Sequence, residues 1–291
     1  MNVKTIGVLA ILGASIMWAI EPIFAKLSYV NSDFLQTSAV RAIFVALIAL
    51  IYTFVTNKGN LKINKKQFSV LVYLALAGTL IADLLYFFAL TTIPVINAVL
   101  IGHMQPIFII LIGFFILKED KLTKFDYFGI FFMILAGLLV TTKTLTNLAM
   151  LKFGTLGDLI VVLASLIWAT TNIAMRKYLR NMNAGVITFY RFLIASFVFS
   201  LYLLPKSLLV FSNVYQILVG VVVGIGTILY YEGLKRLKAA QASGLELSAP
   251  FFAALLGFFV LEEVVTVMQI LGIALLVIGV YFISKKEKVY S

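Results

Sequence analysis

Long apolar stretches follow one another along the chain, with short polar connections between them. A transmembrane α-helix needs about 20 mostly apolar residues, and ten stretches reach about that length. The connections leave no room for a soluble domain. The predicted spans cover residues 5–27, 34–56, 68–90, 94–117, 124–142, 155–178, 186–204, 213–235, 239–261 and 265–283.

The basic residues are distributed unevenly among the connections. If the N-terminus lies in the cytoplasm, 17 of the 23 Lys and Arg residues fall on the cytoplasmic side and 4 on the outer side, while Arg41 and Arg191 lie inside spans. Cytoplasmic connections carry an excess of Lys and Arg. We therefore expect a multi-pass protein of the cell (plasma) membrane with both termini in the cytoplasm.

The composition supports a membrane protein. Apolar residues make up 63% of the chain and charged residues 12%, whereas a soluble domain is about half apolar and a quarter charged. The net charge of +11 would suggest a nucleic-acid partner in a soluble protein. Here the basic residues lie in short clusters between spans, so we expect the lipid bilayer as partner and no nucleic acid.

No cofactor or metal is expected. The chain has no cysteine and a single histidine, His103, which cannot complete a His-rich metal site. Motifs for phosphate-binding loops and dinucleotides are absent. The sequence therefore gives no support to an enzyme that depends on such groups.

The two halves of the chain repeat one another. Matches near the start of each half are 150 residues apart, and later matches are 144 residues apart. The matched pairs are Ala14 with Ala164, Ser15 with Ser165, Trp18 with Trp168, Arg41 with Arg191, Tyr86 with Tyr230, Ala98 with Ala242, Pro106 with Pro250, Gly113 with Gly257, Leu117 with Leu261 and Glu119 with Glu263.

Each half holds five predicted spans, an odd number, so the second half enters the membrane from the opposite face. We expect an all-α integral membrane protein with ten transmembrane helices, arranged as two inverted five-helix repeats in residues 1–147 and 148–291. Inverted repeats are typical of secondary transporters, whose substrate site lies near the midplane between the repeats.

These repeated residues resemble those of the drug/metabolite transporter superfamily, in particular its EamA-type ten-helix members. The resemblance rests on the Trp of the first and sixth spans, the Arg of the second and seventh, and the Ala and Pro of the fourth and ninth. Leu117-x-Glu119 and Leu261-x-Glu263 complete it. It covers nearly the whole chain and implies export or exchange of amino acids, other metabolites or toxic compounds through a central cavity.

Polar and aromatic residues inside the spans are the candidates for that cavity. An ionisable group within a span faces a partner or water, and Pro106 and Pro250 leave carbonyls without their usual donors. The predicted substrate-binding or coupling residues are Trp18, Glu21, Asp83, Tyr86, His103, Gln105, Trp168, Asn172, Tyr230 and Glu246.

Glu21 is the foremost of these candidates. Its repeat position holds Thr171, so the fold does not require a carboxylate there, and Pro22 follows it. It shares a helix face with Trp18, which could contact a cation. We interpret Glu21 as a site for a proton or a substrate amine. The alternatives are an ion pair with Arg41 or a place at the outer end of the helix.

The remaining charged residues of the spans are expected to serve the fold. Estimated depth along each helix predicts structural ion pairs of Arg41 with Glu21 or Asp83, and of Arg191 with Glu232 or Glu246; the alternative for the two arginines is binding of a substrate carboxylate. Glu119 and Glu263 precede the fifth and tenth spans, where we expect them to stabilise helix N-termini.

Taken together, the sequence predicts a secondary transporter of small metabolites that exports amino acids or related compounds by alternating access. Coupling to protons and simple exchange both remain open as the driving mechanism. A lipid-carrier flippase of the same fold is the alternative function. An intramembrane enzyme is a third, but the chain shows no intramembrane protease motif, metal constellation or nucleophile–base pair.

Overall fold

The structure is a computed structural model that describes residues 3–117, 123–152, 154–237 and 239–285. Every regular element in these ranges is helical. Nine of their helical segments are long and apolar enough to cross a membrane, and α14 supplies a shorter tenth. The predicted fold class is confirmed: this is an all-α integral membrane protein with ten transmembrane helices in two inverted five-helix repeats.

The first half contains spans one to five. They are α1 (Val3–Ser28), α2 (Phe34–Asn57), a composite of α3 (Lys65–Tyr73), the π-helix η1 (Leu74–Asp83) and α4 (Leu84–Ala89), a composite of α5 (Val95–Gly102), α6 (Gln105–Ile112) and the π-helix η2 (Gly113–Leu117), and α7 (Lys124–Thr142).

The second half repeats this order after the short helix α8 (Leu145–Ala149). Its spans are α9 (Leu156–Tyr178), α10 (Ala184–Leu203) with the 3₁₀ turn η3 (Leu204–Lys206), α11 (Val214–Arg236), the broken pair α12 (Ala239–Glu246) and α13 (Ser248–Leu261), and α14 (Val267–Lys285).

Polar residues at the helix starts define the spans locally. Asp33 and Gln36 form a reciprocal capping box at the start of α2, in which each side chain accepts a hydrogen bond from the other residue's backbone N–H. Such a box satisfies two N–H groups that would otherwise lack a partner at the helix end. The same device opens α3, α7, α9 and α11.

The fourth and ninth spans are both broken next to their repeat-related prolines. In the fourth, α5 ends at Gly102 and α6 begins at Gln105; in the ninth, α12 and α13 meet at Leu247. Carbonyls next to both breaks face a serine on the first helix of the opposite half. Ser165 Oγ lies 3.2 Å from the Ile101 carbonyl oxygen, and its repeat mate Ser15 Oγ lies 3.4 Å from the Leu245 carbonyl oxygen.

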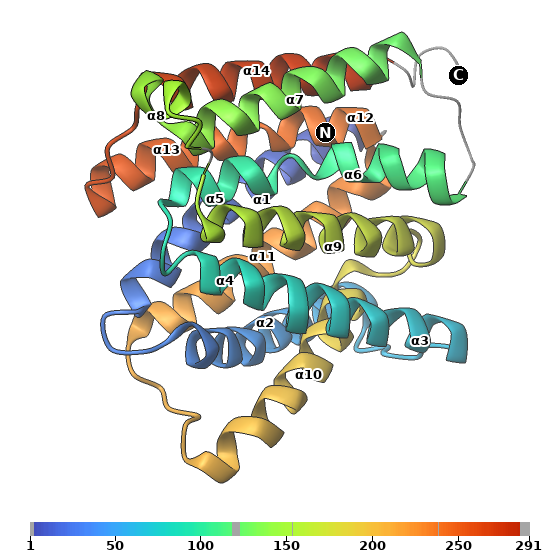
Figure 1. Ribbon diagram of the computed structural model, residues 1–291. Coiled ribbons are helices and arrows are strands. Elements are labelled where there is room, and N and C mark those ends of the chain that lie inside the picture. The colour runs from blue at the N-terminus through green and yellow to red at the C-terminus, as the bar shows by residue number, and fades with distance from the viewer. Residues whose placement is uncertain (1–2, 118–122, 153, 238, 286–291) are drawn as a thin grey trace.

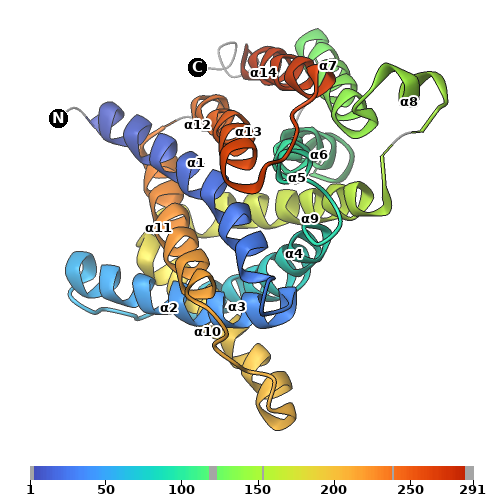
Figure 2. The same cartoon turned by 90° about the vertical axis from the view of Figure 1, so that its left-hand side faces the viewer.

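The two halves interleave rather than standing apart. The first helix of each half packs against the third and fourth spans of the other half: α1 on α11, α12 and α13, and α9 on η1, α4, α5 and α6. Equivalent helices also meet across the halves, α2 with α10 and α7 with α14. The last pair lies side by side along one edge in both views (Figures 1 and 2). The division of the sequence at residue 147 stays a prediction.

Candidate functional site

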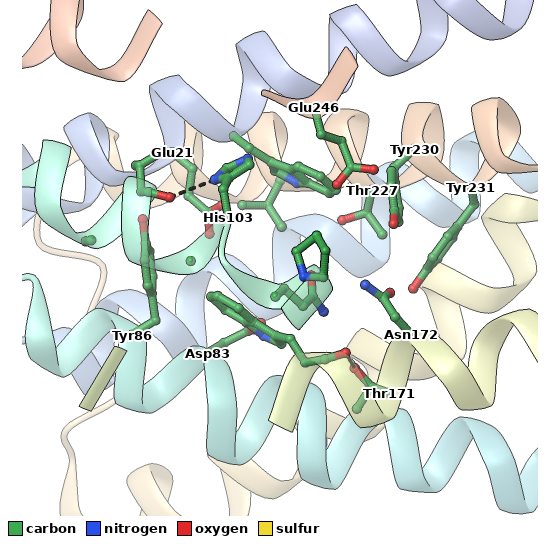
Figure 3. A pocket seen from close by; sticks show the side chains of 18 of the residues that line it. Glu21, Asp83, Tyr86, His103, Thr171, Asn172, Thr227, Tyr230, Tyr231 and Glu246 are labelled. Carbon is green, nitrogen blue, oxygen red and sulfur yellow. Dashed lines mark hydrogen bonds between the residues drawn. The ribbon is translucent and has the colours of Figure 1, made fainter. Parts of the chain in front are cut away.

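A cavity of about 170 Å³ lies among helices of both halves. The structure places all ten sequence-predicted binding or coupling residues on its wall, and adds Arg41 and Arg191. Glu21, Asp83, His103 and Glu246 are among the lining residues labelled in Figure 3. Glu21, Asp83 and Tyr86 lie toward one side of the view, whereas Asn172, Tyr230 and Glu246 lie toward the other. Glu232, the remaining predicted residue, is not part of the wall.

Arg41 on α2 is held by two acids of its own half. Its Nη1 lies 3.0 Å from Glu21 Oε1 and its Nη2 lies 2.7 Å from Asp83 Oδ2. The guanidinium carbon also lies 4.5 Å from the centre of the Phe87 ring. The Arg41 side chain is only 2% exposed, and a buried cation without partners would be costly. These contacts match the predicted partners of Arg41, and Glu21 is thereby one arm of an ion pair as well as a cavity residue.

Arg191 on α10 has different partners from those predicted. Its Nη2 lies 3.6 Å from Asp83 Oδ1, its Nε donates to Thr79 Oγ1 at 2.8 Å, and its Nη1 donates to the Tyr231 hydroxyl at 3.4 Å. The expectation of Glu232 or Glu246 was wrong. Depth along separate helices does not show how they cross, and in the fold η1 of the first half packs against α10.

Glu232 is engaged on its own helix instead. Its carboxylate lies 2.8 Å from Lys235 Nζ and 2.6 Å from Arg236 Nη1. Residues three and four positions apart face one another on a helix, so these contacts are local to the end of α11. Glu232 therefore belongs to an ion pair, although not to the one predicted.

Asp83 makes polar contacts with several side chains on the charged side of the cavity. Besides facing both arginines, its Oδ1 accepts a hydrogen bond from Trp168 Nε1 at 2.8 Å. The indole of Trp168 in turn packs on Tyr86, with ring centres 5.3 Å apart. Asp83 thus joins the third span of the first half to the first and second spans of the second half.

The other side of the cavity carries polar groups with fewer partners. Among the described residues, Glu246 Oε1 and Gln105 Nε2 are buried without a hydrogen-bond partner. The positive charge of Arg176 and the hydroxyl of Tyr230 both interact favourably with the Glu246 carboxylate. Trp18 and Tyr230 pack together with ring centres 4.8 Å apart, so this side combines an acid with an aromatic pair.

His103 lies at the break of the fourth span. Its Nδ1 is 2.7 Å from the Val99 carbonyl oxygen. Because a carbonyl only accepts hydrogen bonds, Nδ1 carries the proton in this contact. In the neutral tautomer with this proton, Nε2 is an acceptor, which is one more polar position on a wall built at a helix break.

Several wall residues were not among the predicted site residues. Two are at helical spacing from residues that were: Thr171 lies three positions after Trp168, and Thr227 lies three before Tyr230. Tyr231 directly follows Tyr230. Arg176 lies four positions after Asn172. It lies in the predicted span 155–178 and in α9, but it was counted among the cytoplasmic basic residues rather than as a site residue. Helical spacing from Asn172 could have identified it.

Contacts between the halves join helix ends near one end of the cavity. Glu263 accepts from Lys26 Nζ at 2.8 Å and from the Val95 backbone N–H at 2.9 and 2.8 Å. The expectation that Glu263 stabilises the tenth span was wrong: it binds the N-terminus of α5, where a negative charge is favoured, and the end of α1. Glu119 lies outside the described residues.

A second contact lies at the same end. Asn97 Nδ2 donates to Asp158 Oδ1 at 2.9 Å, and Gln269 Nε2 donates to Asn97 Oδ1 at 2.7 Å. All three side chains are buried, and they tie together the starts of α5, α9 and α14. At the opposite end of α9, a smaller hollow of about 80 Å³ shares Arg176 and Tyr231 with the cavity. The smaller hollow therefore adjoins the cavity at the basic end of α9, where Arg176 and Lys177 lie.

Comparison with known proteins agrees with this architecture. A 233-residue stretch is 28% identical to an uncharacterized transporter of Synechocystis sp., covering 75% of this chain and 66% of that protein. A 248-residue stretch is 27% identical to the uncharacterized transporter YyaM of Bacillus subtilis, covering 81% and 78%. A solved crystal structure with 18% sequence identity has the same fold, with a TM-score of 0.68 over 96% of both chains.

The chain thus spans about two thirds of the length of the Synechocystis relative. The model of the EamA-like transporter family matches this chain twice, at residues 5–142 and 155–285. These two matches cover the two five-helix halves. The chain belongs to the EamA-like transporter family.

Proposed function

We propose that this membrane transporter is a secondary transporter of small metabolites that exports amino acids or related compounds by alternating access. It would lie in the plasma membrane with both termini in the cytoplasm. The observation that carries the proposal is the cavity itself: both halves line it with charged, amide and aromatic side chains, and inter-half contacts join helix ends near one of its ends. Such a site between inverted repeats suits a substrate that is exposed to each side in turn.

The size of the cavity favours a small metabolite over the lipid-carrier alternative. Pockets for drug-sized ligands measure about 300–1,000 Å³, whereas this one measures about 170 Å³. Its wall also carries acids, arginines and amides on opposite sides, which suits a compact molecule with charged groups. A long lipid chain would find few matching surfaces there.

A gradient rather than a nucleotide supplies the driving force in this proposal, because the sequence has no phosphate-binding loop. Glu21 is the proposed coupling group. It lines the cavity and faces Arg41, while the charges of Asp83 and Arg191 also act on it. A proton on Glu21 changes the charge of this four-residue cluster from zero to positive, so protonation and substrate occupancy would influence one another.

Purified protein in liposomes tests the proposal. We expect liposomes loaded with one unlabelled amino acid to accumulate the same labelled amino acid from outside, and a pH gradient to drive net movement. The Glu232→Gln variant serves as a control, because Glu232 forms its ion pairs on its own helix and does not line the cavity. Liposomes that exchange no amino acid but move a labelled lipid across the bilayer would favour the flippase instead.

A further inference from the structure

The two repeat-related arginines are in unequal surroundings. Arg41 has two acids at 2.7 and 3.0 Å, and its side chain is 2% exposed. Arg191 has one acid at 3.6 Å, and its side chain is 13% exposed. A distance of 3.6 Å is longer than a hydrogen bond. The second arginine therefore lines the cavity with its charge only loosely compensated.

We propose that Arg191 is the carboxylate-binding residue of the transport site, and that a substrate carboxylate takes the place opposite Nη2 that Asp83 now holds. This inference rests on the proposed transport of amino acids and adds which side chain recognises their acid group. The two arginines then have different roles: Arg41 stabilises the fold, and Arg191 binds the substrate.

Asp83 can lose its contact with Arg191 and keep its hydrogen bonds to its other two partners. Its Oδ2 is bonded to Arg41 at 2.7 Å, and its Oδ1 accepts from Trp168 at 2.8 Å. Only the long contact to Arg191 would be exchanged. A guanidinium presents its N–H groups as a planar fork that can bind both oxygens of a carboxylate. Asp83 offers Arg191 a single oxygen, at 3.6 Å, so this bidentate arrangement is not formed.

The surroundings of Arg191 hold the fork in place. Thr79 accepts from Nε, and the Tyr231 hydroxyl lies at 3.4 Å from Nη1, where it can donate to an arriving carboxylate. Gly78 leaves the space that the guanidinium occupies, because an added Cβ there would lie 3.1 Å from Nη2. These contacts come from both halves of the protein.

Charge balance indicates a zwitterion rather than a simple acid. Glu21, Asp83, Arg41 and Arg191 form a cluster with two negative and two positive groups. A simple carboxylate would leave this site with an uncompensated negative charge, which is costly inside a membrane protein. An amino acid brings its own ammonium group and adds no net charge.

Binding to purified, full-length protein tests the inference. The twenty common L-amino acids and their carboxamides, which lack the carboxylate, are compared by their effect on thermal unfolding, and the best amino acid is then used in liposome exchange. We expect at least one amino acid to raise the unfolding temperature while its carboxamide does not. Arg191→Lys keeps the charge but loses the fork, so KM should rise roughly 10- to 100-fold, as expected for loss of a charge-assisted hydrogen bond.

Two further variants keep the test decisive. Gly78→Ala retains Arg191 but crowds its guanidinium, so it should also raise KM, and it does so without removing a buried charge. Arg236→Lys is the matched control, because Arg236 pairs with Glu232 on its own helix and does not line the cavity, and its KM should match the wild type. An unchanged KM in both Arg191→Lys and Gly78→Ala, or carboxamides that bind as well as the acids, overturns the role of Arg191 but leaves amino-acid transport standing. Failure of the wild type to bind or exchange any amino acid overturns both.

Discussion

Arg41 and Arg191 occupy equivalent positions in the two halves, and the difference between them comes from single residues elsewhere. Asp83 stands where the repeat has Thr227, and Glu21 stands where it has Thr171. Both acids belong to the first half, so the charged side of the cavity is asymmetric although the backbone is repeated. Side chains that break the repeat are therefore the ones that define the chemistry of the site.

Replacement of Glu21 by Gln tests its coupling role. Gln imitates the protonated acid and cannot exchange a proton, so proton-driven transport should be lost while equilibrium exchange of the substrate continues. The substitution does not replace Arg41, Asp83 or Arg191, the charged residues around it. The measurement is uptake into liposomes as a function of pH, with Glu232→Gln as the matched change outside the cavity.

Wild-type transport and wild-type pH dependence in the Glu21→Gln protein would remove Glu21 from the mechanism. The coupling role would then pass to Asp83 or Glu246, the other two acids of the wall.

The sequence predicted the cavity wall better than the contacts within it. Polar and aromatic residues at helical spacing on apolar helices must face the protein interior or water, which is why all ten candidates lie on one wall. The partner of Arg191 could not be found in the same way. It depends on where η1 crosses α10, and the repeat pattern does not contain that information.

At the scale of the elements, two kinds of irregular helix shape the site. The fourth and ninth spans break beside proline, and the third is π-helical from Leu74 to Asp83. Thr79 and Asp83 lie on this segment and both face Arg191. π-Helical segments are frequent at functional sites. The proline breaks could be predicted from the sequence, but the π-helix could not, because no residue type marks it.

Pro106→Ala tests the break in the fourth span. Alanine restores a backbone N–H and removes the ring that clashes with the preceding turn, so residues 95–112 should move toward a continuous helix. His103 and Gln105 would then shift on the cavity wall. We expect transport to fall strongly while the free energy of unfolding changes by no more than about 1 kcal/mol.

Pro94→Ala is the matched control for this change. Pro94 is the N-cap residue of α5 and interrupts no helix, so its replacement should leave transport near the wild-type level. Equal transport by the two variants would show that the break at Pro106 has no part in the site.

At the scale of the whole molecule, the ten spans were predictable because each is long, apolar and bounded by polar residues. Helix ends agree with the predicted limits to within a few residues, since capping residues mark them. The interleaving of the halves was not predictable from these signals. It places Lys26, Val95 and Glu263 from distant parts of the chain at one end of the cavity.

Linking Lys26 to Glu263 tests whether this end must open during transport. Both residues are replaced by Cys in a chain that has no other cysteine, and a bifunctional thiosulfonate reagent is chosen whose spacer matches the replaced ion pair. Cross-linking should stop transport, and reduction should restore it. Each single Cys variant treated with the same reagent is the control. Full transport by the cross-linked protein would mean that substrate does not pass this end.

The placement of the ion partners has a consequence for how the protein is made. Arg41 finds both of its acids, Glu21 and Asp83, within the first half, whereas Arg191 takes Thr79 and Asp83 from that half. Ribosomal synthesis delivers the first half first. Its buried cation can be neutralised before the second half emerges, and Arg191 then arrives in a bilayer that already holds its counter-ion. The order of the two halves along the gene is thus suited to co-translational insertion, and the reverse order would bring an arginine into the membrane ahead of its partner.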